Sequence, residues 1–242
     1  MIAASAEALR IVRSVIAEFP SGPNQTGSAF LAPVRGRLVT CAHVVVNDAG
    51  QQATRVRVLR SGQNASVVAD IDTVDRALDL ATLEIDDGVC EGPSVQMDLP
   101  DIGEPLVFAG LPQGVAISSV FPGMVSAVGS RLIASPRCDL IQVAGMINNG
   151  NSGGPLLNET GQIVGIITAK YVPLLVEIDK LRTNLAQIPQ FPSDVGIGQV
   201  DFAQFVNLTI RSMWQMSAVL RLVQVGTGWA VPVKYFSKVG AL

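Results

Sequence analysis

Through its first 170 residues, this chain consists of short apolar or alternating runs that glycine, proline, asparagine and aspartate interrupt. Runs of this length are typical of strands, and alternation puts every second side chain on the same face of a sheet. Thr54-Arg55-Val56-Arg57-Val58 shows the alternation most clearly. The pattern predicts a mostly β protein, and two sheets or barrels of about six strands each would accommodate the runs.

The predicted strands form two sets, which the turn residues around Gly92-Pro93 and Pro100 to Gly103 separate. The first set covers residues 12–19, 27–32, 37–40, 54–60, 65–71 and 80–85. The second set covers residues 106–109, 115–128, 140–146, 154–157 and 163–168, and a short strand and turn are predicted later, at residues 223–231.

A helical insertion is predicted within residues 171–224, where the strand-like rhythm stops. One amphipathic helix is expected from near Pro173 to before Pro189, and a second is expected to follow Asp201, a suitable N-cap. Apolar residues recur at intervals of three and four in the first helix, and at similar spacing in the second. They are Leu175, Ile178, Leu181, Leu185 and Ile188, then Phe202, Phe205, Val206, Ile210, Met213 and Trp214.

The apolar stripes of this insertion have two interpretations. We expect them to pack on the barrel core, as apolar helix faces ordinarily do. The alternative is a surface for a regulatory partner or for a second copy of the chain, which would require exposed apolar area.

Composition excludes several kinds of partner. Only 15% of the residues are charged and the formal net charge is −3, so no basic surface for nucleic acid is expected. Charged residues interrupt every apolar region before it reaches the roughly 18 residues of a membrane-spanning helix. Residues 1–19 also lack the basic start and apolar run of a signal peptide. We therefore expect no membrane partner and a cytoplasmic location.

Cysteine and histidine are too few for a metal site. Cys41, Cys90 and Cys138 are an odd number, and their spacing is not typical of a disulfide framework or a zinc site. With one histidine in the chain, the usual zinc ligand sets cannot be assembled. Isolated buried thiols, no metal and no cofactor are expected.

That histidine, His43, is the one side chain whose ordinary pKa suits general-base catalysis at neutral pH. Far downstream, Ser152 lies in the turn Gly150-Asn151-Ser152-Gly153-Gly154-Pro155. Glycines let the backbone fold tightly there, so the N–H groups of Gly150 and Ser152 can converge on one oxyanion. Ser152 is therefore a candidate nucleophile, although a glycine-rich turn taken alone is more often only a turn.

Serine catalysis also needs a carboxylate that orients the base, and Asp79 is the best candidate. It directly precedes an apolar run, so its side chain is expected at the edge of a sheet, partly buried. A buried carboxylate needs a partner, and His43 is the only imidazole available. Asp70, Asp72 and Asp75 are interpreted as solvated loop residues.

Several further motifs occur in one order along the chain. They are GSAFL at 27–31, LVTCAHVV at 38–45, DLATLEI at 79–85, GEPLVFAGLPQG at 103–114, PGMVS at 122–126, GNSGGPLLN at 150–158, GIITA at 165–169 and GWAVP at 228–232. Together they resemble the trypsin-like serine peptidases, and in particular the HtrA/Deg branch. The resemblance covers nearly the whole chain except the helical insertion.

The resemblance implies an all-β fold of two six-stranded barrels and a helix at the C-terminus, and the predicted helical insertion would lie before the last strand. The first barrel half would comprise residues 1–100 and carry His43 and Asp79. The second would comprise residues 101–242, carry Ser152 and include the insertion at about 171–224. The active site would lie in the cleft between the barrels.

The resemblance also implies the roles of individual residues. Ser152 would be the nucleophile, His43 the general base and acid, and Asp79 the orienting carboxylate, with oxyanion N–H groups from Gly150 and Ser152. Thr168 matches a position whose hydroxyl commonly bonds the aspartate; an ordinary strand threonine is the alternative.

The primary specificity pocket is also assigned by resemblance. Met146 and Ile147 fall on its wall and base, and Thr168, Ala169 and Lys170 belong to the strand beside it. An apolar pocket favours small or medium aliphatic residues over lysine or arginine at the cleaved bond. Lys170 at the rim could favour acidic substrate neighbours, although a solvated surface lysine is the simpler interpretation.

Two departures from the family pattern bear on regulation. Asn151 replaces the aspartate that accepts a newly cut amino terminus in digestive members, so activation by such cleavage is not expected. HtrA/Deg enzymes usually carry a PDZ domain and a signal or membrane anchor, which this sequence is expected to lack. The insertion then becomes the candidate regulatory element. The sequence thus predicts a serine endopeptidase, and the alternative is a protease-like binding or regulatory subunit whose triad is suppressed until a partner binds.

Overall fold

The computed structural model describes residues 1–60, 65–86, 91–111, 117–130, 138–170, 183–184, 187, 196–197, 200–220 and 226–242. It divides into two compact units. The larger unit comprises Met1–Tyr171 and Val225–Leu242, and the smaller comprises Val172–Gln224.

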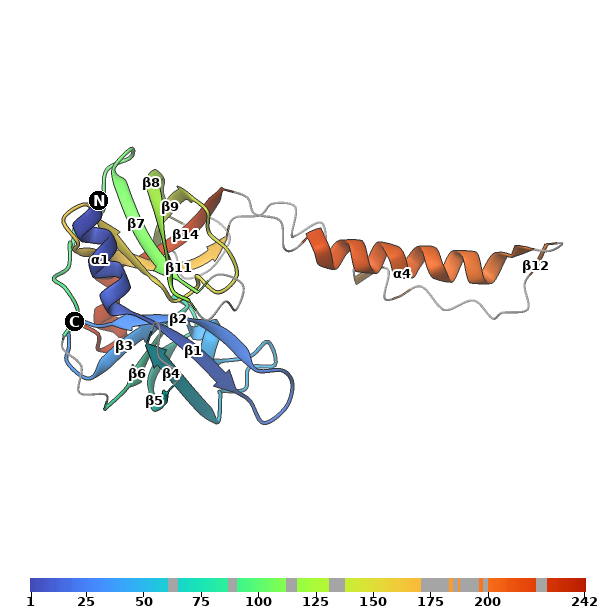
Figure 1. Cartoon of the computed structure of the whole chain (residues 1–242), viewed down its shortest axis with the longest axis horizontal. Helices are drawn as coiled ribbons and strands as arrows, with labels where there is room; N and C mark the ends of the chain where they lie inside the picture. The colour runs from blue at the N-terminus through green and yellow to red at the C-terminus, as the bar shows by residue number, and fades with distance from the viewer. Residues whose placement is uncertain are drawn as a thin grey trace. The chain divides into compact units, whose positions relative to one another are not determined.

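The first six strands of the larger unit close into an antiparallel barrel in the order β1-β2-β3-β6-β5-β4 (Figure 1). They are β1 (Val12–Glu18), β2 (Gln25–Leu31), β3 (Arg37–Thr40), β4 (Arg55–Arg60), β5 (Ser66–Asp75) and β6 (Leu80–Glu84). The alternation predicted for β4 is present, because Val56 and Val58 are buried in the core while Arg55 is exposed.

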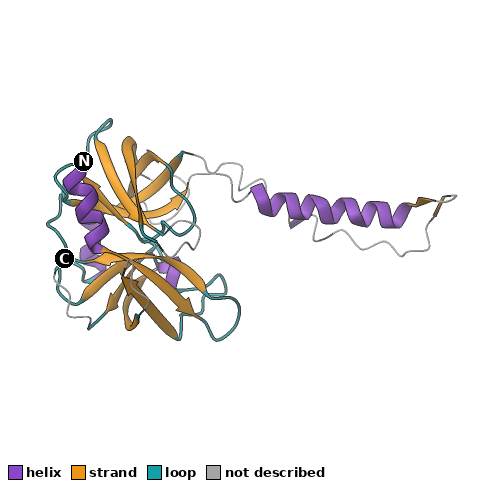
Figure 2. Cartoon of the chain, viewed as in Figure 1, coloured by secondary structure: helices purple, strands orange, loops and turns teal. Residues whose placement is uncertain are grey.

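A second closed barrel follows in the order β10-β11-β14-β9-β8-β7. Its strands are β7 (Pro105–Gly110), β8 (Ser119–Ser130), β9 (Asp139–Gly145), β10 (Pro155–Asn158), β11 (Ile163–Lys170) and β14 (Thr227–Pro232). The prediction of two six-stranded barrels is therefore confirmed (Figure 2). β11 and β14 are neighbours in the barrel, although residues 171–226 separate them in sequence. The predicted division at residue 100 stays a prediction.

The amino terminus forms helix α1 (Ile2–Ile11), which has no counterpart among the predicted elements. Its buried residues Ala4, Ala8 and Ile11 follow a spacing of four and three, and the helix packs on β7 and β10. Two of the three are alanines, whose small side chains give a weak hydrophobic pattern. The helix therefore covers β7 and β10 of the second barrel.

The carboxyl terminus forms the expected helix, of 3₁₀ type, as η2 (Val233–Val239). It packs against β5 and β6 of the first barrel as well as β11 of the second. The rings of Phe236 and Phe30 lie 6.0 Å apart, and the Thr82 hydroxyl donates to the Val239 carbonyl at 3.0 Å. This segment therefore contacts both barrels.

The smaller unit contains helix α4 (Phe202–Leu220), which confirms the helix predicted after Asp201. Two short strands, β12 (Gly196–Ile197) and β13 (Val200–Asp201), precede it. The other predicted helix, between Pro173 and Pro189, falls mostly outside the described residues. No described helix is long and apolar enough to cross a membrane. Exposed apolar side chains on α4 are Phe205, Leu208, Met213, Trp214 and Met216, and packing of these stripes on a barrel stays a prediction.

Candidate active site

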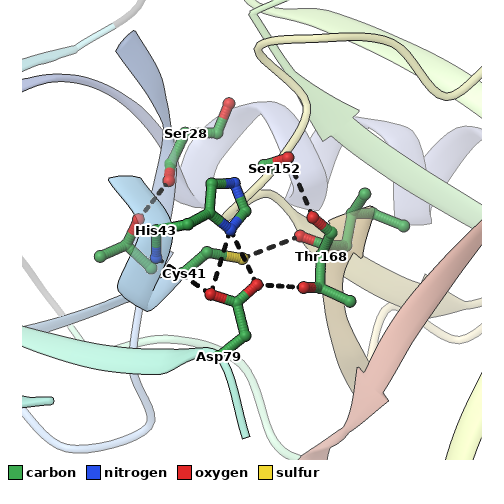
Figure 3. A network of polar contacts seen from close by, with 8 residues as sticks. Ser28, Cys41, His43, Asp79, Ser152 and Thr168 are labelled. Carbon is green, nitrogen blue, oxygen red and sulfur yellow. Dashed lines mark hydrogen bonds and ion pairs between the residues drawn. The ribbon is translucent and has the colours of Figure 1, made fainter. Parts of the chain in front are cut away.

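Strand pairing in the first barrel brings His43 and Asp79 together. His43 lies on the short helix α2 (Ala42–Val45), which directly follows β3, and Asp79 directly precedes β6. Thr40 and Ala81 are paired in the β3–β6 ladder, so the chain segments just beyond this pair meet. The Nδ1 atom of His43 lies 2.8 Å from Asp79 Oδ2 and 3.0 Å from Oδ1 (Figure 3). The His43 backbone N–H also donates to Asp79 Oδ1 at 3.0 Å.

Asp79 adopts a left-handed backbone conformation with φ 56°, alone among the described non-glycine residues. Such a conformation costs about 1–3 kcal/mol and persists where surrounding contacts impose it. Here the Asp79 carbonyl accepts from the Ala42 N–H at 3.2 Å, while Asp75 Oδ1 accepts the N–H groups of Ala77 and Leu78. These bonds fix the turn that directs the Asp79 side chain toward His43.

The interpretation of Asp70, Asp72 and Asp75 as loop residues was wrong. All three lie in β5, which extends four residues beyond the predicted end at residue 71. Asp72 Oδ2 lies 3.1 Å from the Thr82 hydroxyl oxygen and pairs with Arg37 at 3.4 Å. Pairing with β6 through Asp75 and Leu80 prolongs the strand in spite of its charged residues, because ladder hydrogen bonds outweigh the low β propensity of aspartate.

The electrostatic environment stabilises an ion pair between the two residues. Burial opposes protonation of His43, but the hydrogen bond and negative charge of Asp79 outweigh it and raise the pKa of the imidazole above its ordinary 6.5. Burial likewise disfavours the charged form of Asp79, yet hydrogen bonds from His43 and Thr168 lower the pKa of that carboxyl. Asp79 is therefore ionised at neutral pH and favours the imidazolium form of His43.

The turn that carries Ser152 has the tight backbone expected of it. Asn151 N–H donates to the Asn148 carbonyl at 3.1 Å, with Gly150 at φ 95° in the third position of that turn. Gly153 has φ 87°, and a Cβ there would lie 1.9 Å from the Ser28 carbonyl oxygen. Among the described residues, neither the Gly150 N–H nor the Ser152 N–H has a hydrogen-bond acceptor. Both donors are available to bind an oxyanion.

Ser152 and Asp79 are connected through Thr168 on β11. The Thr168 hydroxyl donates a short hydrogen bond to Asp79 Oδ2, so this carboxylate is held between His43 and Thr168 (Figure 3). The Ser152 hydroxyl donates to the Thr168 backbone carbonyl at 3.1 Å. Within the described residues it makes no hydrogen bond with His43. The three candidate residues are thus brought into one site, with the serine hydroxyl turned toward β11.

Cys41 lies beside these residues, fully buried. Its Sγ, a ligand atom of His43 and a carboxylate oxygen of Asp79 lie within 4.8 Å of one another. The thiol contacts the Ile167 carbonyl at 3.3 Å, and burial, followed by the nearby charge of Asp79, raises the pKa of Cys41. The thiol therefore stays protonated at neutral pH. Cys90 lies outside the described residues.

Two of the predicted pocket residues contact the Ser152 turn, because the Met146 carbonyl accepts from Asn151 Nδ2 at 3.5 Å and the Thr168 carbonyl accepts from the Ser152 hydroxyl. Met146 is exposed just after β9, whereas Ile147 is buried in the core of the second barrel. The backbone of Ala169 and Lys170 belongs to β11 and pairs with Trp229 and Gly228. Their assignment to a specificity pocket stays a prediction.

Sequence reasoning gave no role to Ser28, although Gly27-Ser28 belongs to a motif of the resemblance. Ser28 is fully buried under the Ser152 turn and bonds to it through both its backbone and its hydroxyl. The presence of Ser28 in that motif was the one indication of a role in the sequence. Strand alternation predicts that its hydroxyl faces inward, but it does not predict which groups the hydroxyl contacts.

Comparison with known proteins places this site in a family. The sequence model of the trypsin-like peptidase domain matches residues 27–166. The chain belongs to the trypsin-like peptidases. That match includes His43, Asp79 and Ser152, and the two closed barrels agree with it.

Relatives of this trypsin-like peptidase include HtrA and Deg proteins. It is 30% identical to "Putative protease Do-like 3, mitochondrial" of Arabidopsis thaliana, over 79% of this chain and 35% of that protein. It is 33% identical to "Serine protease HTR4" of Rattus norvegicus, over 68% of this chain and 34% of that protein. The chain therefore spans about a third of the length of these relatives.

Solved structures agree with the fold. The HtrA-type protease AlgW with a bound tripeptide is 25% identical, with a TM-score of 0.67 over 98% of this chain and 61% of that one. A protease named Rv3671c from M. tuberculosis, in its active form, has a TM-score of 0.62 at 20% identity, over 70% of this chain and 74% of that one. This second likeness concerns the fold alone.

Proposed function

We propose that this trypsin-like peptidase is a serine endopeptidase that cleaves peptide bonds through Ser152, His43 and Asp79. The observation that carries the proposal is the His43 Nδ1 contact with Asp79 at 2.8 Å, next to a serine turn with two N–H donors that have no acceptor in the described part of the chain. A base, its orienting carboxylate, a hydroxyl and an oxyanion site are the parts that acyl transfer by serine needs.

In the proposed reaction, the Ser152 hydroxyl turns from the Thr168 carbonyl toward His43, which takes its proton as Oγ attacks the substrate carbonyl carbon. The resulting oxyanion is bound by the N–H groups of Gly150 and Ser152. His43 then donates the proton to the leaving amine, and the peptide bond breaks to give an acyl-enzyme. Water, deprotonated by His43, attacks the ester, and Ser152 recovers its proton as the acid product leaves.

Covalent labelling with a fluorophosphonate probe tests the proposed function, because such probes react with an activated serine at the oxyanion site. We expect the unaltered chain to be labelled at one residue and Ser152→Ala to remain unlabelled. Ser126→Ala, which loses a serine in the second barrel whose hydroxyl donates to Gln142, is the control and should label fully. Absence of labelling in the unaltered chain, with or without a candidate partner, would contradict the proposal.

Activity is expected to rise with pH through a midpoint above 6.5. His43 must be neutral to accept the serine proton, and Asp79 raises the pKa at which the imidazole loses its own proton. The group is thus charged and inactive below that pKa, and neutral and active above it. The pH profile of kcat/KM measures this midpoint in the free enzyme. A midpoint at or below 6.5 would show that Asp79 does not stabilise the imidazolium.

The specificity pocket is a separate proposal. An apolar pocket at Met146 and Ile147 would accept small or medium aliphatic side chains at the cleaved bond, since neither residue offers a carboxylate to lysine or arginine. Profiling of cleavage products from a peptide library measures the preference. Cleavage after lysine or arginine would contradict this pocket while leaving the proposed catalytic residues intact.

A second candidate function is a protease-like subunit whose triad is suppressed until a partner binds. The hydrogen bond from Ser152 to Thr168, in place of one to His43, favours this form of regulation. Residues 171–224 would supply the contact with a partner or with a second copy, because α4 presents exposed apolar side chains. Labelling that appears only after a partner is added would favour this candidate.

A cytoplasmic location also remains a proposal from the sequence, and the Arabidopsis thaliana relative is named as mitochondrial.

A further inference from the structure

Ser28, on β2, lies directly under the turn that holds the two oxyanion donors. We infer that Ser28 is a positioning residue for the oxyanion site, and that its hydroxyl holds Gly150 in the orientation that the reaction needs. This inference rests on the proposed function, because an oxyanion forms only if Ser152 attacks a carbonyl.

Two hydrogen bonds join Ser28 to the two residues whose N–H groups would bind the oxyanion. The Ser28 backbone N–H donates to the Ser152 carbonyl at 2.8 Å. The Ser28 hydroxyl donates to the Gly150 carbonyl at 2.7 Å. The carbonyls of both residues are thus bonded to one residue of the first barrel, while their N–H groups have no acceptor among the described residues.

The Ser28 hydroxyl is itself fixed by its surroundings. Its oxygen accepts the Leu111 N–H at 3.1 Å, so the single hydroxyl proton remains for Gly150. The Thr40 hydroxyl donates to the Ser28 carbonyl at 2.7 Å, which holds the backbone from the other side. Ser28 is fully buried, and no solvent replaces these bonds at its surface.

Close packing around Ser28 leaves room only for a small side chain, and the hydrogen bond to Gly150 requires that this side chain carry a hydroxyl. A Cβ on Gly110 would lie 3.1 Å from Ser28 Oγ and 2.7 Å from the Asn151 Cα. The space between β2, the end of β7 and the turn is therefore filled. Removal of the hydroxyl would leave the buried Leu111 N–H and the partly buried Gly150 carbonyl without their partner.

Gly150 needs such an anchor because glycine restrains its own backbone weakly. At φ 95°, Gly150 can change to other backbone conformations at little cost in energy, because it has no side chain. Rotation of Gly150 would turn its N–H away from the oxyanion while leaving Ser152, His43 and the substrate pocket in place. The expected defect is therefore in transition-state binding and falls on kcat, with KM little changed.

The test compares Ser28→Ala with the Ser126→Ala control in peptide hydrolysis. Complete loss of one oxyanion donor costs about 10²- to 10³-fold in kcat. Because Ser28→Ala leaves the Gly150 N–H present but poorly held, we expect kcat to fall by about 10- to 100-fold with KM within about twofold. Ser126→Ala also loses a hydroxyl that donates to a strand carbonyl, at 3.1 Å, and should keep its kcat.

A peptide aldehyde gives a readout that a structural role would not move. Its adduct with Ser152 places an oxygen in the oxyanion site, whereas the same peptide as an amide binds without forming one. Ser28→Ala should weaken aldehyde binding by the factor lost in kcat, and leave amide binding unchanged. Unchanged kcat, or equal weakening of both ligands, would overturn the inference.

Two further outcomes are distinguished by the same set of proteins. If Ser28→Ala does not fold, Ser28→Cys keeps a donor at this position, though a weaker one on a larger sulfur atom, and should show an intermediate kcat; an unaltered kcat would overturn the inference. If the unaltered chain is not labelled by the fluorophosphonate probe, the proposed function fails and this inference fails with it. Labelling of the unaltered chain combined with full activity of Ser28→Ala overturns only the role of Ser28.

Discussion

His43→Gln and Ser152→Ala are each expected to lower kcat by about 10⁶-fold, and the double variant is expected to lose no more than either alone. Glutamine cannot accept the serine proton, and alanine provides no nucleophile, so each change removes the same catalytic route. Because the two residues act as one unit, their losses do not add. Steady-state cleavage of a peptide found in the library profile measures all three variants.

The control for this experiment is a measurement of whether His43→Gln still folds. The His43 side chain is bonded to Asp79 alone among the described residues, and its ring is half exposed. Thermal unfolding of His43→Gln should therefore remain close to that of the unaltered chain. Additive losses in the double variant, or appreciable hydrolysis by Ser152→Ala, would show that another group performs the reaction.

Asp79→Asn is expected to lower kcat by about 10⁴-fold. The amide cannot hold the imidazole with Nδ1 as donor as the carboxylate does, and it does not stabilise the imidazolium that forms during attack. The hydrogen bond from Thr168 and the ion pair with His43 both lose their charged acceptor. The same change removes the cause that raises the pKa of His43, so the residual activity should rise through a lower pH midpoint than in the unaltered chain.

Asp75→Asn is a matched control for this variant. It changes a carboxylate to an amide four residues away, and its Oδ1 can still accept the N–H groups of Ala77 and Leu78 that hold the turn. We expect nearly full activity and an unmoved pH midpoint. If Asp75→Asn and Asp79→Asn lost activity equally, the effect of Asp79 would lie in the turn and not in its contact with His43.

Much of the fold was predictable because its strands are short and strongly patterned. The alternation around Val56 and Val58 and the turns between runs predicted strands whose ends mostly lie within a few residues of those observed. α1 was not predicted, since Ala4 and Ala8 mark its buried face only weakly. β5 was predicted too short because Asp72 and Asp75 resemble loop residues until their strand partners are known.

The candidate site was predictable in its residue types, and not in its geometry. The single histidine, an aspartate before a strand and a serine among glycines were visible as a set. Sequence alone determined those groups and their order, because hydrophobic periodicity and glycine content are local properties of the chain. Tertiary structure decided the left-handed conformation of Asp79, the bond from Ser152 to Thr168 and the anchor from Ser28 to Gly150. Each of these depends on contacts between residues far apart in sequence, such as Ser28 and Gly150, which only the packing of the two barrels against each other brings within hydrogen-bonding distance.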